Sequence, residues 1–129
     1  MAHPNEVRLR DRYAAFARGD LAGFLDGCTD DVIFTVPGTT LASGVFTKET
    51  FIPWISRVIG ATGGTFREDV LDVFANDDHG VLLLFHEFDR LGRREYRTAH
   101  ICELRDGKIA KWTEHPGSLA EFEAAWGRG

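Results

Sequence analysis

Four strand-like segments joined by short turns fill the second half of the chain, and this pattern limits the fold more than any other feature. The segments cover residues 66–74, 81–89, 93–104 and 108–114, and a glycine lies in each intervening turn. In the third segment most odd positions are charged and most even positions are uncharged, as in a strand with one buried face. Long strands joined by tight turns pair with their neighbours in sequence. We therefore expect an antiparallel sheet with one buried face.

Helical patterns come first along the chain. The first covers residues 5–18, where apolar side chains recur at helical spacing at Leu9, Tyr13 and Phe16. Gly19 suits the position after the helix end, because a left-handed conformation costs little without a side chain. The next expected elements are a short helix capped by Asp20, a turn over 29–31, a strand over 32–36, a loop over 41–45 and a helix within 47–59.

Two local features affect where the remaining helices are expected to begin. Pro53 lies inside the third helical pattern, so we expect that helix to start late or to kink. Ser118 and Glu121 form a capping box for a short last helix. We expect its apolar side chains to face the body of the protein, namely Leu119, Phe122 and Trp126. Helices followed by a meander of long strands indicate an α+β fold, a curved antiparallel sheet with helices on one face.

Composition excludes several classes of protein. The 129 residues suit one domain, which we expect to span residues 1–129. A net charge of −5 argues against nucleic acid as a partner. No apolar run approaches the ~20 residues that span a bilayer, and the chain does not begin with a signal-peptide pattern. With only two cysteines, we expect a reduced, cytoplasmic protein that has no membrane partner.

The loops of the last two hairpins decide which side chains share a face. Gly92 and Gly107 each stand third in an expected three-residue loop, with glycine in the left-handed position. A two-residue turn at Asp106-Gly107 is the alternative for the final hairpin. The two registers differ by one residue, and a shift of one residue exchanges the faces of a strand. We expect the three-residue loops.

These loops place several polar side chains on the inner face. His86 is expected opposite Tyr96, His100 opposite Trp112, and Glu114 diagonal to His100. A carboxylate beside an imidazole can orient it, and burial can instead make the carboxyl group an acid or a base. A buried hydrogen-bonded pair without chemistry is the alternative. The two-residue turn would place His100 and Glu114 on opposite faces.

Two segments of the sequence resemble a known family. The first runs from Arg12 to Phe24 (RYAAFARGDLAGF) and continues with Asp30-Asp31-Val32, and the second runs from His100 to Ile109 (HICELRDGKI). Both resemble the SnoaL-like polyketide cyclase and ketosteroid-isomerase-like domains of the nuclear-transport-factor-2-like superfamily. The resemblance implies a cone-shaped fold around a deep pocket, often in a homodimer. It also implies acid–base chemistry without a cofactor, such as isomerisation, cyclisation, dehydration or epoxide opening.

The resemblance also implies roles for single residues. Tyr13 matches the tyrosine that donates a hydrogen bond to the substrate oxygen in ketosteroid isomerases. His100 stands nearest to their protonated aspartate, and Glu114 stands nearest to an acid on the last strand of polyketide cyclases. Val36 stands where the isomerases carry their aspartate base, which argues against steroid isomerisation by that mechanism. We therefore take Glu114, His100 and Tyr13 as candidate catalytic residues.

Aromatic and apolar side chains on the same face are candidate walls of the pocket. The candidate substrate-binding residues are Trp112, Phe34, Val36, Trp54, His86, Tyr96 and Phe88, with ordinary core packing as the alternative. His86-Glu87 and Glu114-His115 are adjacent pairs whose members point to opposite faces of a strand. We therefore expect no metal site.

The leading hypothesis is an acid–base enzyme of the isomerase or cyclase type, without a cofactor, acting on a small apolar polyketide-, steroid- or terpenoid-like compound. In it Glu114 and His100 move protons, and Tyr13 donates to a carbonyl or enolate oxygen. The first alternative is a non-catalytic ligand-binding or dimerisation module of the same fold. The second is a lyase, a dehydratase that uses His86 and His100.

Overall fold

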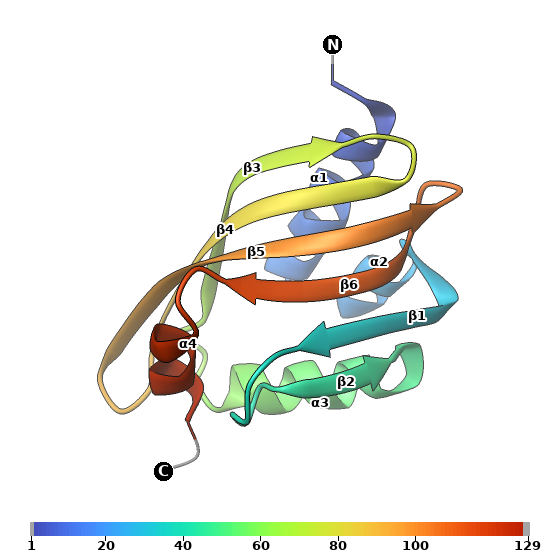
Figure 1. Ribbon diagram of the computed structural model, residues 1–129. Helices are drawn as coiled ribbons and strands as arrows, with labels where there is room; N and C mark the ends of the chain where they lie inside the picture. The colour runs from blue at the N-terminus through green and yellow to red at the C-terminus, as the bar shows by residue number, and fades with distance from the viewer. Residues whose placement is uncertain (1, 128–129) are drawn as a thin grey trace.

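A curved six-stranded sheet and the helices packed on it form the molecule (Figure 1). This computed structural model describes residues 2–127. The elements in chain order are α1 (Pro4–Ala17), α2 (Leu21–Leu25), β1 (Cys28–Val36), β2 (Gly44–Thr47), α3 (Lys48–Gly60), β3 (Arg67–Ala75), β4 (His79–Asp89), β5 (Arg93–Arg105), β6 (Lys108–Pro116) and α4 (Leu119–Trp126). α1 packs against β3 and β4, α3 against β1 and β2, and α4 against β5. The α+β class is confirmed.

The strand order is β2-β1-β6-β5-β4-β3. All neighbouring strands are antiparallel except β1 and β6, which run parallel, so the expectation of a wholly antiparallel sheet is wrong for this pair. The long connection through α3 and the β3–β5 meander allows β6 to return beside β1 in the same direction. β1 also begins at Cys28, so residues 29–31 belong to a strand rather than to a turn.

The β4–β5 hairpin has the expected register. His86 pairs with Tyr96, and Asp89 pairs with Arg93 across a three-residue loop. Gly92 has a φ of 107° and adopts the positive value expected of a glycine there. Leu91 also has a positive φ, 53°, which the sequence did not indicate.

The β5–β6 hairpin differs from the expected one in its turn. Arg105 pairs with Lys108, so the turn has two residues, Asp106 and Gly107, with φ values of 53° and 79°. Two successive positive φ values are typical of the type I′ turn that Asp-Gly favours. The expected three-residue loop is therefore wrong.

The two-residue turn alone would exchange the two faces of β6, but a β-bulge in β6 reverses this exchange. Leu104 pairs with Ile109, but Glu103 pairs with Lys111, so Ala110 is the additional residue. Ile109 consequently takes the inner position expected for Ala110. Past the bulge His100 lies opposite Glu114, and Cys102 lies opposite Trp112. His100 and Glu114 thus share the inner face, as expected, but as directly opposed residues.

The helices follow the sequence closely, with two exceptions. α3 begins at Lys48 and continues through Pro53, so the late start is wrong. Its buried side chains lie at helical spacing at Phe51, Trp54 and Val58, and this packing outweighs the hydrogen bond that Pro53 removes. In α4, Phe122 and Trp126 are buried, whereas Leu119 is 51% exposed.

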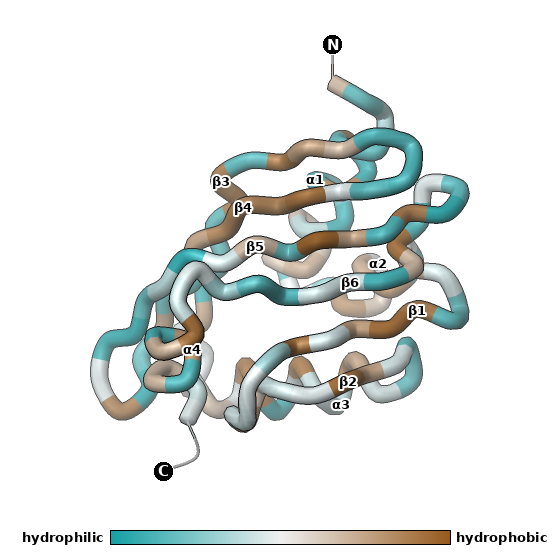
Figure 2. The backbone as a smooth tube through the Cα atoms, viewed as in Figure 1, coloured by the Kyte–Doolittle hydropathy of each residue, from teal (hydrophilic) through white to brown (hydrophobic). Residues whose placement is uncertain are grey.

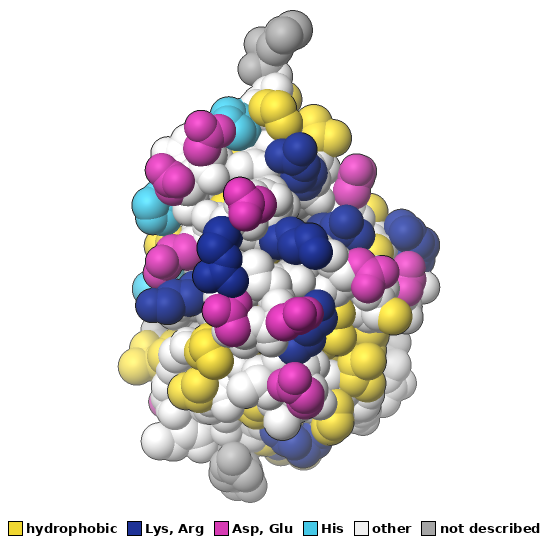
Figure 3. All heavy atoms as spheres, turned by 90° about the vertical axis from the view of Figure 1, so that its right-hand side faces the viewer, with side chains coloured by type: hydrophobic (Ala, Val, Ile, Leu, Met, Phe, Trp, Pro, Cys, Tyr) yellow, Lys and Arg dark blue, Asp and Glu magenta, His cyan; other side chains and the backbone are white. Residues whose placement is uncertain are grey.

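Hydrophobic stretches alternate with hydrophilic ones along β1, β4 and β5, and the β3–β4 turn is mostly hydrophilic (Figure 2). Figure 3 shows the end of the molecule where the β3–β4 and β5–β6 turns lie, and basic and acidic side chains are interspersed over its upper part. No helix of residues 2–127 combines the length and apolar character needed to cross a membrane. The buried face of the sheet, under the helices, contains the polar residues described next.

Candidate active site

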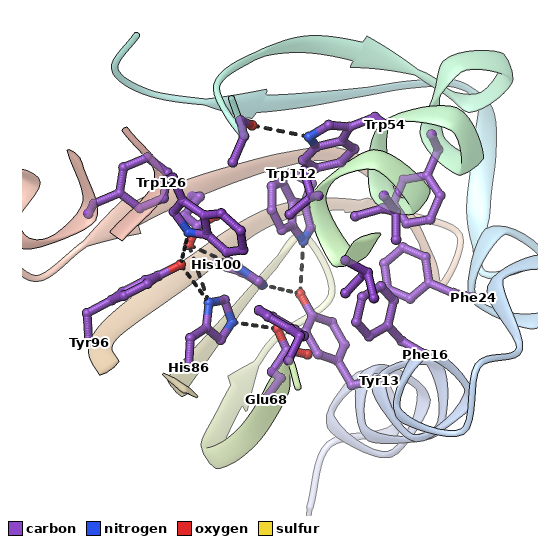
Figure 4. A pocket seen from close by; sticks show the side chains of 18 residues that line it. Tyr13, Phe16, Phe24, Trp54, Glu68, His86, Tyr96, His100, Trp112 and Trp126 are labelled. Atoms are coloured by element: carbon purple, nitrogen blue, oxygen red, sulfur yellow. Dashed lines mark hydrogen bonds and ion pairs between the residues drawn. The ribbon is translucent and has the colours of Figure 1, made fainter. Parts of the chain in front are cut away.

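A small cavity lies between the inner face of the sheet and the helices (Figure 4). Its volume is about 60 Å³, room for about four to six water molecules at ~10–15 Å³ each. Its apolar walls come mainly from α1, α3 and α4, and its polar groups come mainly from the strands, with the Tyr13 hydroxyl from α1. The lining residues that carry the argument are Tyr13, Glu68, His86, Tyr96, His100, Trp112, Glu114 and Trp126. All three tryptophans of the chain line this cavity.

A chain of hydrogen bonds runs from Trp112 through Tyr13 to His100. Trp112 Nε1 donates to the Tyr13 hydroxyl oxygen at 2.9 Å, and that oxygen lies 2.6 Å from His100 Nδ1. An indole nitrogen can only donate, so the tyrosine accepts from Trp112 and has its own proton to give to His100. His100 Nδ1 is then an acceptor, and the proton of the imidazole lies on Nε2.

A second chain of the same kind ends on a carboxylate. Trp126 Nε1 donates to the Tyr96 hydroxyl at 2.7 Å, and this hydroxyl lies 3.0 Å from His86 Nδ1. By the same reasoning the hydroxyl of Tyr96 donates to Nδ1, and His86 Nε2 donates to Glu68 Oε2 at 2.7 Å. Two Trp–Tyr–His chains thus converge on one cavity.

The two chains differ at their ends. His86 Nε2 has Glu68 as its acceptor, whereas His100 Nε2 has no hydrogen-bond partner although His100 is only 3% exposed. Among the described residues it is the single buried side-chain nitrogen or oxygen atom without a partner. An unpaired buried donor costs about 1–3 kcal/mol, so a ligand that accepts this proton would satisfy it.

Glu114 lies next to that unpaired donor. Its Oε2 accepts a hydrogen bond from the Thr98 hydroxyl at 2.9 Å and lies 3.8 Å from His100 Nε2 and 4.0 Å from His86 Nδ1. Burial alone would raise the pKa of Glu114, but the two imidazoles and the Thr98 hydroxyl outweigh it, and the pKa is lowered. Glu114 is therefore an ionised, buried carboxylate at neutral pH.

The pKa values of the other groups agree with the directions of these hydrogen bonds. Burial, assisted by nearby acidic groups, raises the pKa of both Tyr13 and Tyr96 well above the usual value, so both hydroxyls keep their protons. Burial opposes the charging of His86, but the hydrogen bond and charge of Glu68, with the charge of Glu114, raise its pKa overall. His86 is thus protonated more readily than an ordinary histidine.

The expected wall residues divide into two groups. Trp54, His86, Tyr96 and Trp112 line the cavity, as expected for contact with a ligand. The remaining three, Phe34, Val36 and Phe88, are buried but are not lining residues. Other aromatic rings lie between two of them and the cavity, since Phe34 packs on Trp112 and Phe88 stacks on Trp126. These three belong to the supporting core.

Glu68 is a polar residue of the site that the sequence did not reveal. It pairs with His86 across β3 and β4, and its side chain is 9% exposed. A register shift between Val70 and Asp72 makes Leu71 an additional residue and brings Glu68 to the inner face. Arg67, Glu68 and Asp69 are consecutive charged residues, so no sequence pattern distinguishes the middle one.

Glu68, His86 and His100 can each turn one ligand atom toward a common point, since these atoms lie within 4.8 Å of one another. The expectation of no metal considered only residues adjacent in sequence, and this cluster joins three strands. A metal on Nε2 of both histidines would require the proton on Nδ1, where metal-bound histidines usually donate to an acceptor. Both Nδ1 atoms face tyrosine hydroxyls that already accept from tryptophan and need an acceptor themselves. The hydrogen-bond network therefore favours proton chemistry over metal binding.

Comparison with known proteins identifies the family. The model of the SnoaL-like domain matches residues 9–112, which contain both segments singled out in the sequence. The chain belongs to the SnoaL-like family. Uncharacterized proteins of Mycobacterium bovis and Mycobacterium tuberculosis are 30% identical to it over 121 residues, 92% of each chain.

Solved structures share the fold. Bal32a, from a soil-derived mobile gene cassette, has a TM-score of 0.87 at 26% identity and covers 95% of each chain. An NTF2-like protein of unknown function from Burkholderia pseudomallei has a TM-score of 0.83 at 20% identity, covering 95% of this chain and 97% of its own. These structural similarities confirm the nuclear-transport-factor-2-like fold that the sequence resemblance implied.

Proposed function

We propose that this SnoaL-like protein is an acid–base enzyme that needs no cofactor and removes a proton from carbon beside a carbonyl group, in an isomerisation or cyclisation. One observation carries the proposal: the buried carboxylate of Glu114 and the unpartnered Nε2 atom of His100 lie 3.8 Å apart on one cavity wall. The opposite walls are aromatic and aliphatic. The proposed substrate is accordingly a small, largely apolar carbonyl compound of the polyketide, steroid or terpenoid kind.

Glu114 is the proposed base. The C–H bond breaks, its proton passes to the carboxylate, and its electron pair forms the C=C bond of an enolate. Where the substrate carries a C=C bond β,γ to the carbonyl, the protonated carboxyl group then returns the proton to the γ carbon of the dienolate, which gives the conjugated isomer. In a cyclisation the enolate carbon instead attacks a second carbonyl of the same molecule, and the proton goes to the new alkoxide. Neither sequence requires an oxidant or a reductant.

His100 is the proposed donor to the developing enolate oxygen. Its Nε2–H is fixed in direction because Tyr13 holds Nδ1, and Trp112 in turn holds Tyr13. A donor fixed before the reaction stabilises negative charge most where water is excluded. Since the Tyr13 hydroxyl is already engaged on both sides, we assign Tyr13 to positioning His100 rather than to direct contact with the substrate oxygen.

A dehydratase is the second candidate function. His86, whose pKa is raised, lies with its ring 5.9 Å from that of His100 and its Nδ1 4.0 Å from Glu114 Oε2. Glu114 would take a proton from carbon, and protonated His86, through the Tyr96 hydroxyl, would protonate a departing hydroxyl group. If His86→Asn leaves a dehydration activity intact, this candidate fails.

The primary experiment follows exchange of α-protons for deuterium in D₂O by proton NMR, using a panel of cyclic and aryl ketones. We expect the protein to accelerate exchange for some of them. Glu114→Gln should slow the exchange at least ~100-fold, in line with the usual contribution of a general base. Glu103→Gln is the matched control, because Glu103 lies on the outer side of β5 beside Lys111 and should leave the rate unchanged.

Binding without exchange favours a different function. All three tryptophans line the cavity, so quenching of their fluorescence reports binding independently of turnover. Ketones that bind tightly while their α-protons never exchange would favour the non-catalytic binding module. Equal exchange rates for the wild type and Glu114→Gln would remove Glu114 from the mechanism.

A further inference from the structure

A wide groove lies outside the cavity, at the ends of α1 and α3 and the beginning of β3. Its volume is about 750 Å³, more than ten times that of the cavity. The residues that line the groove but not the cavity are Ala17, Gly19, Leu21, Ser56, Gly60, Gly64, Arg67 and Asp69. None of them takes part in the hydrogen-bond chains described above.

The groove and the cavity share five lining residues, which we call the neck. Both are lined by Phe16, Ile55, Ile59, Phe66 and Glu68. Four of these five side chains are apolar, and the fifth is tied to His86 by a 2.7 Å hydrogen bond, which leaves the neck mostly hydrophobic. A ligand reaching Glu114 from the groove therefore passes between apolar side chains.

Glycines keep the groove open. Gly60, at the end of α3, does not have a positive φ, and a Cβ atom there would meet no atom within 4 Å. Its backbone therefore does not demand a glycine, and the small residue simply leaves space. Gly64 likewise borders open space, although its φ of 84° favours glycine. Leu21 and the four apolar neck residues give the groove hydrophobic walls.

We propose that the groove is a second subsite, which holds the elongated apolar body of a ligand whose carbonyl end reaches Glu114 and His100. The placement of the carbonyl rests on the proposed function. The binding of the apolar body in the groove rests on the two volumes and the shared neck residues. The cavity alone holds only a few atoms, and a compact substrate would leave a hydrophobic neck and groove without use. The ligand class is a carbonyl compound with an alkyl chain or linked rings extending from a compact reacting end.

The test uses acetophenone and 4-alkylacetophenones with chains from methyl to octyl, with binding followed by tryptophan fluorescence. We expect the dissociation constant to fall roughly fourfold per methylene while the chain lies in the neck and groove, because each buried methylene contributes about that factor. A dissociation constant that does not change with chain length would overturn the proposal.

A variant locates the effect in the groove. Ser56→Arg places a long charged side chain in it and should weaken octyl binding at least tenfold, with a much smaller effect on acetophenone. Ile52→Arg introduces the same residue at an exposed position of α3 that lines neither space, and it should leave both affinities unchanged. Equal losses for long and short ligands in Ser56→Arg would contradict a separate subsite.

The two proposals can fail separately. Chain-length-dependent binding without α-proton exchange would sustain the subsite and overturn the catalytic function. Exchange of acetophenone protons with no gain from longer chains would do the reverse. A change in oligomeric state caused by Ser56→Arg, measured by light scattering, with ligand affinities unaltered, would assign the groove to contact between copies of this chain and overturn the subsite.

Discussion

His100 and Glu114 face each other across β5 and β6, with His100 Nε2 3.8 Å from Glu114 Oε2. This distance is too long for a hydrogen bond, so a buried donor and a buried carboxylate stand side by side without satisfying each other. A substrate with a carbonyl oxygen and an adjacent C–H bond can engage both at once. Buried polar groups with a purely structural role are normally hydrogen-bonded, so this unsatisfied pair favours a ligand-binding role.

Removing the hydroxyl of Tyr13 should damage both stability and turnover. In Tyr13→Phe the indole N–H of Trp112 and the Nδ1 atom of His100 lose their partner in a buried region. We expect a loss of about 1–3 kcal/mol in the free energy of unfolding, measured by urea denaturation. Tyr96→Phe is the matched variant, because it orphans Trp126 in the same way. It should cost similar stability but lower kcat less, and equal losses of kcat would contradict the positioning role of Tyr13.

Stability should depend on pH through Glu114 and His86. The lowered pKa of folded Glu114 means that its contribution is present above the ordinary value of 4.5 and is lost as pH falls through the folded pKa. The raised pKa of folded His86 means that its contribution is complete below 6.5 and is lost as pH rises through the folded pKa. These two groups together favour a maximum between about pH 4.5 and 6.5.

The melting temperature measured from pH 3 to 9 tests this dependence. Glu114→Gln should flatten the acidic limb of the profile, and His86→Asn should flatten the alkaline limb. Glu103→Gln, on the outer side of β5, should leave both limbs in place. An unaltered acidic limb in Glu114→Gln would show that other carboxylates determine the acid sensitivity.

Zinc should bind weakly despite the three candidate ligands. Binding through Nε2 of His86 and His100 would force both tyrosine hydroxyls to give up their acceptors. We expect isothermal titration with Zn²⁺ at pH 7 to show no one-to-one site tighter than about 100 µM, equivalent to ~5.5 kcal/mol. A tight site that Glu68→Gln weakens would reverse the assignment of the histidine protons and favour a metal enzyme.

Leu91 is a place where a surface substitution should stabilise the protein. It is 74% exposed and has a φ of 53°, a conformation that costs a residue with a side chain roughly 1–2 kcal/mol. Leu91→Gly removes that strain but adds freedom to the unfolded chain, so we expect a net gain of up to about 1 kcal/mol. The same replacement at exposed Leu119, the first residue of α4, should destabilise by less than about 1 kcal/mol, because glycine costs most in a helix interior. A melting temperature lowered in both variants would contradict the strain at Leu91.

Much of the fold could be predicted because local signals and tertiary structure agree. The alternation in β4 and β5 and the three-residue loop at Gly92 gave the pairing of His86 with Tyr96. The order of helices before a meander of long strands gave the α+β class and the curved sheet. These features depend on residues close in sequence or on patterns shared by many related chains.

The two β-bulges limited what could be predicted of the site. The common face of His100 and Glu114 was expected from a three-residue turn, but it arises from a two-residue turn and a bulge at Ala110. The bulge at Leu71 places Glu68 on the inner face, and the sequence did not predict this position. A bulge depends on how two strands pack. Neither Ala110 nor Leu71 is of a residue type that marks a bulge in the sequence. A register shift of one residue exchanges the two faces of a strand, and such shifts are therefore the main source of error in predicting this sheet from sequence.

The protonation of the His100 ring tests the proposed donor most directly. Long-range proton–nitrogen NMR correlations on ¹⁵N-labelled protein distinguish a proton on Nε2 from a proton on Nδ1. We predict a proton on Nε2 and an accepting Nδ1, with Tyr13→Phe removing this preference while His86 keeps its own. A proton on Nδ1 in the wild type would contradict the donor role of His100 and, with it, the proposed mechanism.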